Sequence, residues 1–297
     1  MKLVDLLNDE YAPLRMLKEK AHLQFRLSLT RWSEHLGRDP VLTDLQPLPV
    51  QQFVAARRAR VSTATALKDR VHVVALWNHA ARRRLVDQFP TLPPLRAPKR
   101  IPRAYRLEEV SALVRTARAL DGTVAGLPRG LWWATLLRSC WETGERCGSH
   151  WQLRWEDVDL DRGTVTFRAE TRKGGSRDIQ RAISHEQVAW LRQLRAAGRA
   201  GLVWPWELSH CLLWRHLKLL ALAAGVPHRG FHGLRRASAS YLAAAGGNAT
   251  EHLSHSSPTL ARDHYLDPSI ARGQSALDYL PALDLGPGLA DVGQEPR

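Results

Sequence analysis

The segment 90–103, PTLPPLRAPKRIPR, constrains the fold of this chain most, because its five prolines exclude a continuous helix. Proline lacks the backbone N–H that a helix interior needs and clashes with the preceding turn. The segment also carries four cationic residues, and such a basic, proline-rich stretch is typical of a linker. We therefore predict a domain at 1–92, a linker at 93–103 and a second domain at 104–281. The glycine-rich residues 282–297 are expected to form a flexible tail.

The first domain has the apolar periodicity of amphipathic helices. One predicted helix runs from about Leu14 to Leu36 and ends at Gly37, where glycine favours termination. A second follows Thr63. The apolar stripe of the first holds Phe25, Leu29, Trp32 and Leu36, and that of the second holds Leu67, Val71, Val74, Trp77, Ala81 and Leu85. The sequence thus predicts a small helical bundle with a basic outer surface.

The second domain changes its periodicity partway along. Residues 164–170 and 177–183 alternate as strands do, and the glycines between them favour a hairpin. Helices are also predicted at 105–120, 185–197, 209–224, 232–245 and 269–280. One further predicted helix ends at Gly144, and another follows the turn that contains Arg146. We expect a mainly α protein, in which a helical bundle precedes a mostly helical domain with a small antiparallel β-sheet.

The charge of the chain indicates a polyanionic partner. The 43 Lys and Arg residues exceed the 29 acidic ones, which gives a net charge of +14. A field of this size attracts nucleic acid before small acidic molecules. In the linker, Lys99, Arg100 and Arg103 are candidate DNA-binding residues.

The cysteines and the apolar runs indicate a cytoplasmic, nucleoid-associated protein. Three cysteines without a CxxC pair give neither a disulfide framework nor a zinc motif. The first 20 residues are interrupted by charges, unlike the apolar centre of a signal peptide. No apolar run approaches the roughly 18 residues that span a bilayer, so no membrane association is expected. We also find no P-loop and no metal-binding motif, and expect no cofactor and no metal.

Two arginine positions suit a phosphate. His232 and Arg235 share one face at the start of a predicted helix, which places an imidazole beside a fixed cation. Arg236 satisfies the helical spacing nearly as well, and spacing alone does not choose between the two. Arg146 follows the helix-ending TG and is expected in a cleft. Two converging arginines would stabilise the charge of a phosphoryl transition state.

Lys173 and Tyr265 add reactive groups. Lys173, at the hairpin tip, is the only lysine between Lys99 and Lys218 in a chain that otherwise uses arginine. A lysine near arginines is pushed toward its neutral form and can donate a proton, which arginine effectively never does. Tyr265 follows His255 by ten residues. A tyrosine becomes a nucleophile where cations and a base lower the cost of ionisation.

Read in order, TGERCGSHWQLRWEDVDL, the hairpin lysine, HGLR, and HSS followed by tyrosine resemble the catalytic domain of the tyrosine recombinases, or phage-type integrases. The resemblance covers residues 104–281, and the helices before it look like that family's core-binding domain. It implies that Arg146 and Arg235, rather than Arg236, clamp the scissile phosphate. By the same resemblance Lys173 is the general acid, His232 assists proton transfer, His255 takes the second histidine position, and Tyr265 forms a 3′-phosphotyrosyl bond.

The resemblance also implies the partners. They are double-stranded DNA sites and a homotetramer on two of them, in which the chain after Tyr265 packs on a neighbouring subunit; accessory DNA-bending proteins are further candidates. Three departures stand out, namely Ser149 in place of an acidic residue, Ser254 in place of glycine, and a longer His255 to Tyr265 spacing. The alternatives are an inactive DNA-binding protein of the same fold, a helix-turn-helix regulator, and a type IB topoisomerase.

Overall fold

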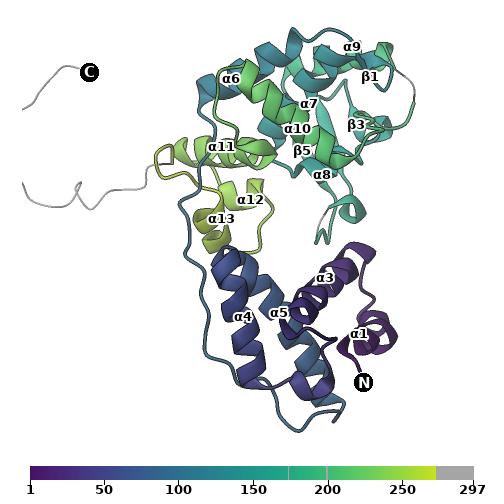
Figure 1. The fold of residues 1–297 in the computed structure, drawn as a ribbon. Coiled ribbons are helices and arrows are strands. Elements are labelled where there is room, and N and C mark those ends of the chain that lie inside the picture. Colours follow the sequence, from purple (N-terminus) through teal and green to yellow (C-terminus); the bar gives the residue numbers. More distant parts are fainter. Residues whose placement is uncertain (173, 199, 272–297) are drawn as a thin grey trace, which may run out of the picture. The chain divides into compact units, whose positions relative to one another are not determined.

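The computed structural model describes residues 1–172, 174–198 and 200–271 (Figure 1). The chain divides into two compact units, Met1–Arg100 and Ile101–Arg297. This division falls inside the proline-rich segment. Residues 93–103, all of them described, form neither helix nor strand.

The N-terminal unit is helical. Its elements are α1 (Leu3–Asp5), a π-helical stretch (Leu6–Tyr11), α2 (Ala12–Leu14), α3 (Glu19–Leu36), a 3₁₀ turn (Leu42–Asp44), α4 (Pro47–Arg60) and α5 (Thr63–Arg82). Its core contains Trp32 stacked on Phe53 with ring centroids 5.6 Å apart, and Trp77. The predicted end of α3 at Gly37 is confirmed, because Gly37 takes the left-handed conformation that terminates the helix. The helix α4 was not predicted.

The predicted apolar stripe of α5 is right at Trp77 and Ala81, which are buried, and wrong at Val71, which is 55% exposed. The rest of the buried face contains Ala66, Val73, Leu76 and Ala80. Asp69 lies in that face, 2% exposed, and pairs with Arg31 and Arg57, each at 2.9 Å. The buried face therefore contains a charged residue, whose carboxylate is satisfied by two arginines. Because of this charge, the apolar pattern of the sequence pointed to the neighbouring stripe.

The C-terminal unit is mixed but mostly helical. Its helices are α6 (Leu107–Arg118), α7 (Arg129–Thr143), α8 (Cys147–His150), α9 (His185–Ala196), α10 (His210–Ala223), α11 (Gly230–Ala244), α12 (Ala249–His252) and α13 (Pro258–His264). One antiparallel sheet pairs β1 (Thr123–Val124) with β2 (Leu127–Pro128). The other has the order β3 (Val158–Asp159), β4 (Thr164–Phe167), β5 (Ile179–Ala182) and is antiparallel throughout.

The hairpin prediction is confirmed in β4 and β5, where Val165 faces Arg181 and Phe167 faces Ile179. Two other predictions were wrong or untested. The helix expected after Arg146 is only the single turn of α8, because residues 155–157 form a 3₁₀ turn that leads into β3. The helix expected at 269–280 falls mostly outside the described residues, and 268–270 form a turn.

Helix α7 organises the core of this unit. Most of its residues are buried on every side, and it packs against α6, α9 and α11 (Figure 1). Trp132 and Trp133 contact each other with centroids 5.1 Å apart, and Trp133 stacks with Phe231 of α11. Because α7 is fixed on all sides, its C-terminal end at Gly144 gives a rigid base for the turn that carries Arg146. Among the described helices none is long and apolar enough to cross a bilayer.

Candidate active site

The candidate residues come from three places in the C-terminal unit. Arg146 lies in the turn between α7 and α8, whereas His232 and Arg235 lie in the first two turns of α11. His255 lies between α12 and α13, and Tyr265 directly follows α13. Helix α11 packs on both α7 and α12, so the fold holds these segments against one another (Figure 1).

Arg235 is the buried centre of this arrangement, with 1% of its surface exposed. One guanidinium nitrogen, Nη1, donates to the carbonyl of Gly144, and Nη2 donates to the carbonyl of Leu253 at 2.8 Å. These bonds connect α11 to the end of α7 and to the segment before His255. Burial, together with the positive charge of Arg146, lowers the pKa of Arg235 to about 10. Arg235 therefore remains cationic at neutral pH.

His255 is held as a neutral hydrogen-bond acceptor. Its Nε2 lies 3.2 Å from Nη2 of Arg235, and because arginine can only donate, Nε2 accepts. In the neutral ring the proton is then on Nδ1, a buried atom without a partner among the described residues. Burial, followed by the charges of Arg235 and Arg146, lowers the pKa of His255 to about 4.

The ring of Tyr265 lies against both of these groups. Its centroid is 4.6 Å from that of His255, and the guanidinium carbon of Arg235 lies 5.1 Å from it. His232 is farther away, with ring centroids 6.5 Å apart. The backbone of Tyr265 is fixed by Ala261, whose carbonyl accepts from its N–H at 2.9 Å. The structure thus brings one tyrosine, one buried arginine and two histidines together.

Arg146 and His232 line the more open side of this group. Arg146 is half-buried, in an extended backbone conformation just before α8, and its guanidinium forms no hydrogen bond or ion pair within the described residues. His232 is partly exposed to solvent, and the partial burial of its ring, followed by the charges of Arg236 and Arg235, lowers its pKa. Arg236 points elsewhere, because its Nε donates to the carbonyl of His264 at 3.1 Å. Of the two arginines, Arg235 is the one buried beside Tyr265.

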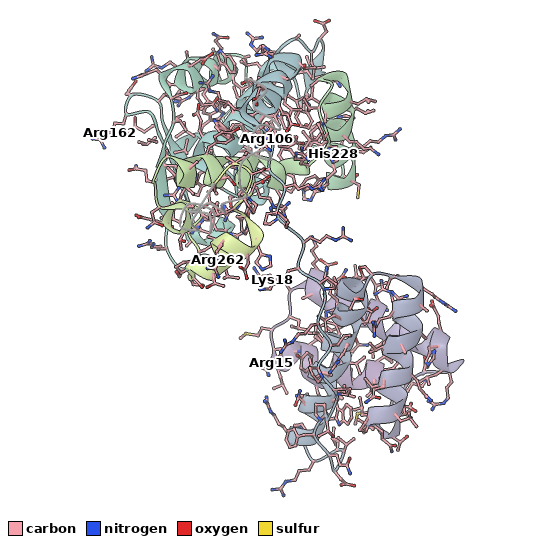
Figure 2. All side chains as sticks on the ribbon, turned by 90° about the vertical axis from the view of Figure 1, so that its left-hand side faces the viewer. Arg15, Lys18, Arg106, Arg162, His228 and Arg262 are labelled. Carbon is pink, nitrogen blue, oxygen red and sulfur yellow. The ribbon has the colours of Figure 1, made fainter. Side chains whose placement is uncertain are left out.

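Lys173 lies outside the described residues. Its neighbour Arg172 is described and is 8% exposed. The three candidate DNA-binding residues, Lys99, Arg100 and Arg103, are exposed in the extended segment between the helices of the two units. Exposed arginines such as Arg162 and Arg262 also project from the C-terminal unit (Figure 2).

The group is suited to binding an anion. Nε of Arg235 and Nδ1 of His255 are buried donors without a partner among the described residues. An unsatisfied buried donor costs about 1–3 kcal/mol, so an acceptor supplied by another molecule would stabilise this group. Arg146 adds a second cation to the same region. A phosphodiester offers the acceptor oxygens and the negative charge that this combination of groups stabilises.

The sequence pattern of the phage integrase family matches residues 105–271, which is more than half of the chain and includes every candidate residue from Arg146 to Tyr265. The chain belongs to the phage integrase family. Within the described residues, this integrase-family chain has no group of three or more His, Cys, Asp or Glu side chains that could hold a metal ion.

Curated relatives and solved structures agree with this membership. The integrase-family chain is 26% identical over 242 residues to tyrosine recombinase XerC of Xanthomonas campestris pv. campestris, covering 77% of this chain and 72% of the relative. It is 28% identical over 182 residues to tyrosine recombinase XerD of Ralstonia nicotianae, covering 60% and 56%. Among solved structures it resembles the XerH recombinase bound to difH substrate, with a TM-score of 0.67, 15% identity and 93% and 82% coverage. It also resembles a lambda integrase dimer bound to a core site, with a TM-score of 0.65, 16% identity and 96% and 100% coverage. These two structures support the fold.

Sequence reasoning missed an acidic residue that contacts this candidate site. Glu145 is 1% exposed, and one of its oxygens lies 4.0 Å from Nη1 of Arg235. Burial by itself would raise the pKa of Glu145, but Arg235 and Arg172 hold it below its usual value. The available signal was the acidic residue placed between the helix-ending glycine and Arg146. Ser149, the first departure from the family pattern, is buried and donates its N–H to the carbonyl of Arg146 at 2.9 Å.

Ser254, the second departure from the family pattern, takes a backbone conformation that favours glycine. Its φ is 52°, in the left-handed region that glycine adopts without strain. Its hydroxyl accepts a hydrogen bond from Arg181 of β5 at 3.0 Å. The serine therefore keeps the backbone path toward His255 and adds a contact to the sheet.

Proposed function

We propose that this chain is a site-specific DNA recombinase that breaks and rejoins strands through a 3′-phosphotyrosyl intermediate on Tyr265. The observation that carries the proposal is the placement of Tyr265 against His255 and the buried Arg235, at 4.6 Å and 5.1 Å. The family to which the chain belongs supports the same chemistry. DNA is the proposed substrate, in line with the net charge of +14.

In the proposed first step, the Tyr265 hydroxyl oxygen attacks the scissile phosphorus. A bond between the Tyr265 oxygen and phosphorus forms, the bond to the 5′ oxygen breaks, and the proton of the Tyr265 hydroxyl passes to a base, which is the transfer that His232 is proposed to assist. We assign Arg146 and Arg235 to the charge that develops on the non-bridging oxygens. Lys173 is proposed as the acid that protonates the leaving 5′ oxygen, with His232 assisting proton transfer and His255 holding Arg235 and the phosphate.

In the second step, a 5′ hydroxyl from the other strand attacks the phosphotyrosine. That attack restores a phosphodiester and releases Tyr265, so the bond energy is kept and no nucleotide is consumed. We propose a homotetramer on two DNA sites as the assembly in which strands are exchanged, and the cytoplasm, at the nucleoid, as the place of action. One of the similar solved structures, a lambda integrase tetramer bound to a Holliday junction, supports that assembly.

A nicked suicide substrate tests the proposal. Cleavage beside the nick releases a short oligonucleotide, so the covalent complex accumulates and shifts on denaturing electrophoresis. We expect a shifted band with the wild-type chain and none with Tyr265→Phe, which should still bind the same DNA. Absence of a wild-type adduct on sites that the protein binds would refute the recombinase function and favour a DNA-binding protein without catalysis.

The salt dependence of binding tests the charge argument separately. Each neutralised phosphate is expected to contribute a slope of about 0.9 to the fall of log affinity with log salt concentration. Replacing Arg100 and Arg103 with alanine should lower that slope by up to about 2. An unchanged slope would remove these residues from the DNA contact.

A further inference from the structure

Glu145 places a buried carboxylate between two buried arginines. One oxygen, Oε1, accepts a hydrogen bond from Nη2 of Arg172 at 3.2 Å, and Oε2 lies 4.0 Å from Nη1 of Arg235. The same Oε2 accepts the backbone N–H of Arg146 at 3.2 Å. A single carboxylate therefore contacts the turn after α7, the segment between β4 and β5, and helix α11.

The partner Arg172 is itself a buried residue, from the segment between β4 and β5. It is 8% exposed, and its Nη1 donates to the carbonyl of Arg177 at 3.2 Å. The ion pair between Arg172 and Glu145 is therefore held from the side of the sheet as well as from the turn after α7.

Electrostatics explain why an acidic residue is needed here. Arg146, Arg172 and Arg235 all contact Glu145, and the charges of Arg146 and Arg235 repel each other in a region of low dielectric. The charge of Glu145 is among the groups that raise the pKa of Arg235 against burial and the repulsion of Arg146. Without it, two buried guanidinium groups would lose a nearby counter-charge and would move apart or toward solvent.

We propose that Glu145 is a positioning residue of the recombinase site, which holds Arg146 and Arg235 and is itself held by Arg172. This inference rests on the proposed function. Glu145 contacts the arginines and not the reacting atoms, so its removal should slow cleavage more than it weakens DNA binding. A displacement of about 1 Å of a catalytic group can cost on the order of 10²-fold in rate.

Glu145→Gln is the principal test, because it keeps the shape and removes the charge. With saturating nicked suicide DNA in single turnover, we expect adduct formation to slow by at least about tenfold, while the dissociation constant changes by less than about threefold. Glu145→Asp keeps the charge and should recover part of the rate. A Glu145→Gln rate within threefold of wild type, or Glu145→Asp no faster than Glu145→Gln, would overturn the proposal.

Glu142→Gln is the matched control. Glu142 is a partly buried carboxylate in α7, but it binds Arg138 and Ser184, each at 2.6 Å, and not the arginines of the site. We expect this variant to lower the melting temperature without slowing cleavage at saturating DNA. If both variants slow cleavage in proportion to their loss of stability, Glu145 is structural only.

Arg172→Gln keeps the proposal testable if Glu145→Gln does not fold. It should slow cleavage as well, because it removes the partner that holds Glu145, and a wild-type rate for it would overturn the proposal. The wild-type chain is measured first in every series. If the wild type forms no adduct, the proposed recombinase function is refuted. If the wild type forms the adduct, the rates of the variants test the role of Glu145 alone.

Discussion

Substituting Gly144 by alanine should disable the site through one added carbon atom. Gly144 ends α7 with φ 61°, and its carbonyl accepts from Arg235. A Cβ there would lie 2.8 Å from Cδ2 of His252 and closer still to its Nε2. That ring is hydrogen-bonded to Ser238 of α11 at 2.7 Å, so it cannot move without breaking a contact inside the site.

The expected cost has two parts. The left-handed conformation costs a residue with a Cβ about 1 kcal/mol. Displacing His252 adds about 1 kcal/mol for the hydrogen bond to Ser238, and the steric shift adds a comparable amount. The total for Gly144→Ala is about 2–4 kcal/mol of unfolding free energy. Cleavage of the suicide substrate should fall as well, because the Gly144 carbonyl positions Arg235.

Gly225→Ala separates the two parts. Gly225 lies in the same unit with φ 68°, and an added Cβ there would meet no atom within 4 Å. It should therefore lose only the conformational part, about 1 kcal/mol. Urea unfolding followed by tryptophan fluorescence measures both, because nine of the 11 tryptophans lie beyond residue 100. Equal destabilisation of the two variants, or a wild-type cleavage rate in Gly144→Ala, would refute the reasoning.

Two further predictions concern the same unit. Ser254→Ala loses the hydrogen bond from Arg181 but keeps the strained φ of 52°, whereas Ser254→Gly also relieves that strain; the glycine variant should be more stable by about 1 kcal/mol in urea unfolding, and equal stabilities would contradict this. His252 and His255 both have a pKa near 4 in the folded chain, below the ordinary value of 6.5, so the unfolded chain binds more protons and stability is lost as pH falls from about 6.5 toward 4. His252→Gln should make the melting temperature less sensitive to pH over that range, and an unchanged slope would exclude His252 as a source.

Local features of the sequence predicted local features of the fold. The helix ends at Gly37 and Gly144 and the β4–β5 hairpin depend on residues within a few positions of each other, and all three are confirmed. Contacts between residues far apart in the chain could not be predicted from the sequence in the same way. The pairing of Asp69 with Arg31, 38 residues earlier in the chain, made the apolar stripe of α5 misleading.

In the candidate site, too, local patterns were predicted from the sequence and long-range contacts were not. The order of the motifs identified the residues near Tyr265, but spacing alone did not distinguish Arg235 from Arg236, since either fits a helical face with His232. Packing of α11 against the end of α7 and the His255 segment decides which arginine is buried. Glu145 was missed for a related reason, because its partner Arg172 lies 27 residues away and the contact exists only after the hairpin folds back.

The charge states of the free site explain why it should respond to phosphate. Burial and the mutual repulsion of Arg146 and Arg235 lower the pKa of Arg235 to about 10, and burial with the same two arginines lowers that of His255 to about 4. A phosphodiester bound between them brings a negative charge into this field, and an opposite charge at close range favours the protonated form of both groups. The phosphate should therefore raise both pKa values. The repulsion between Arg146 and Arg235 in the free protein is thus offset by the negative charge of the phosphodiester, the group on which they are proposed to act.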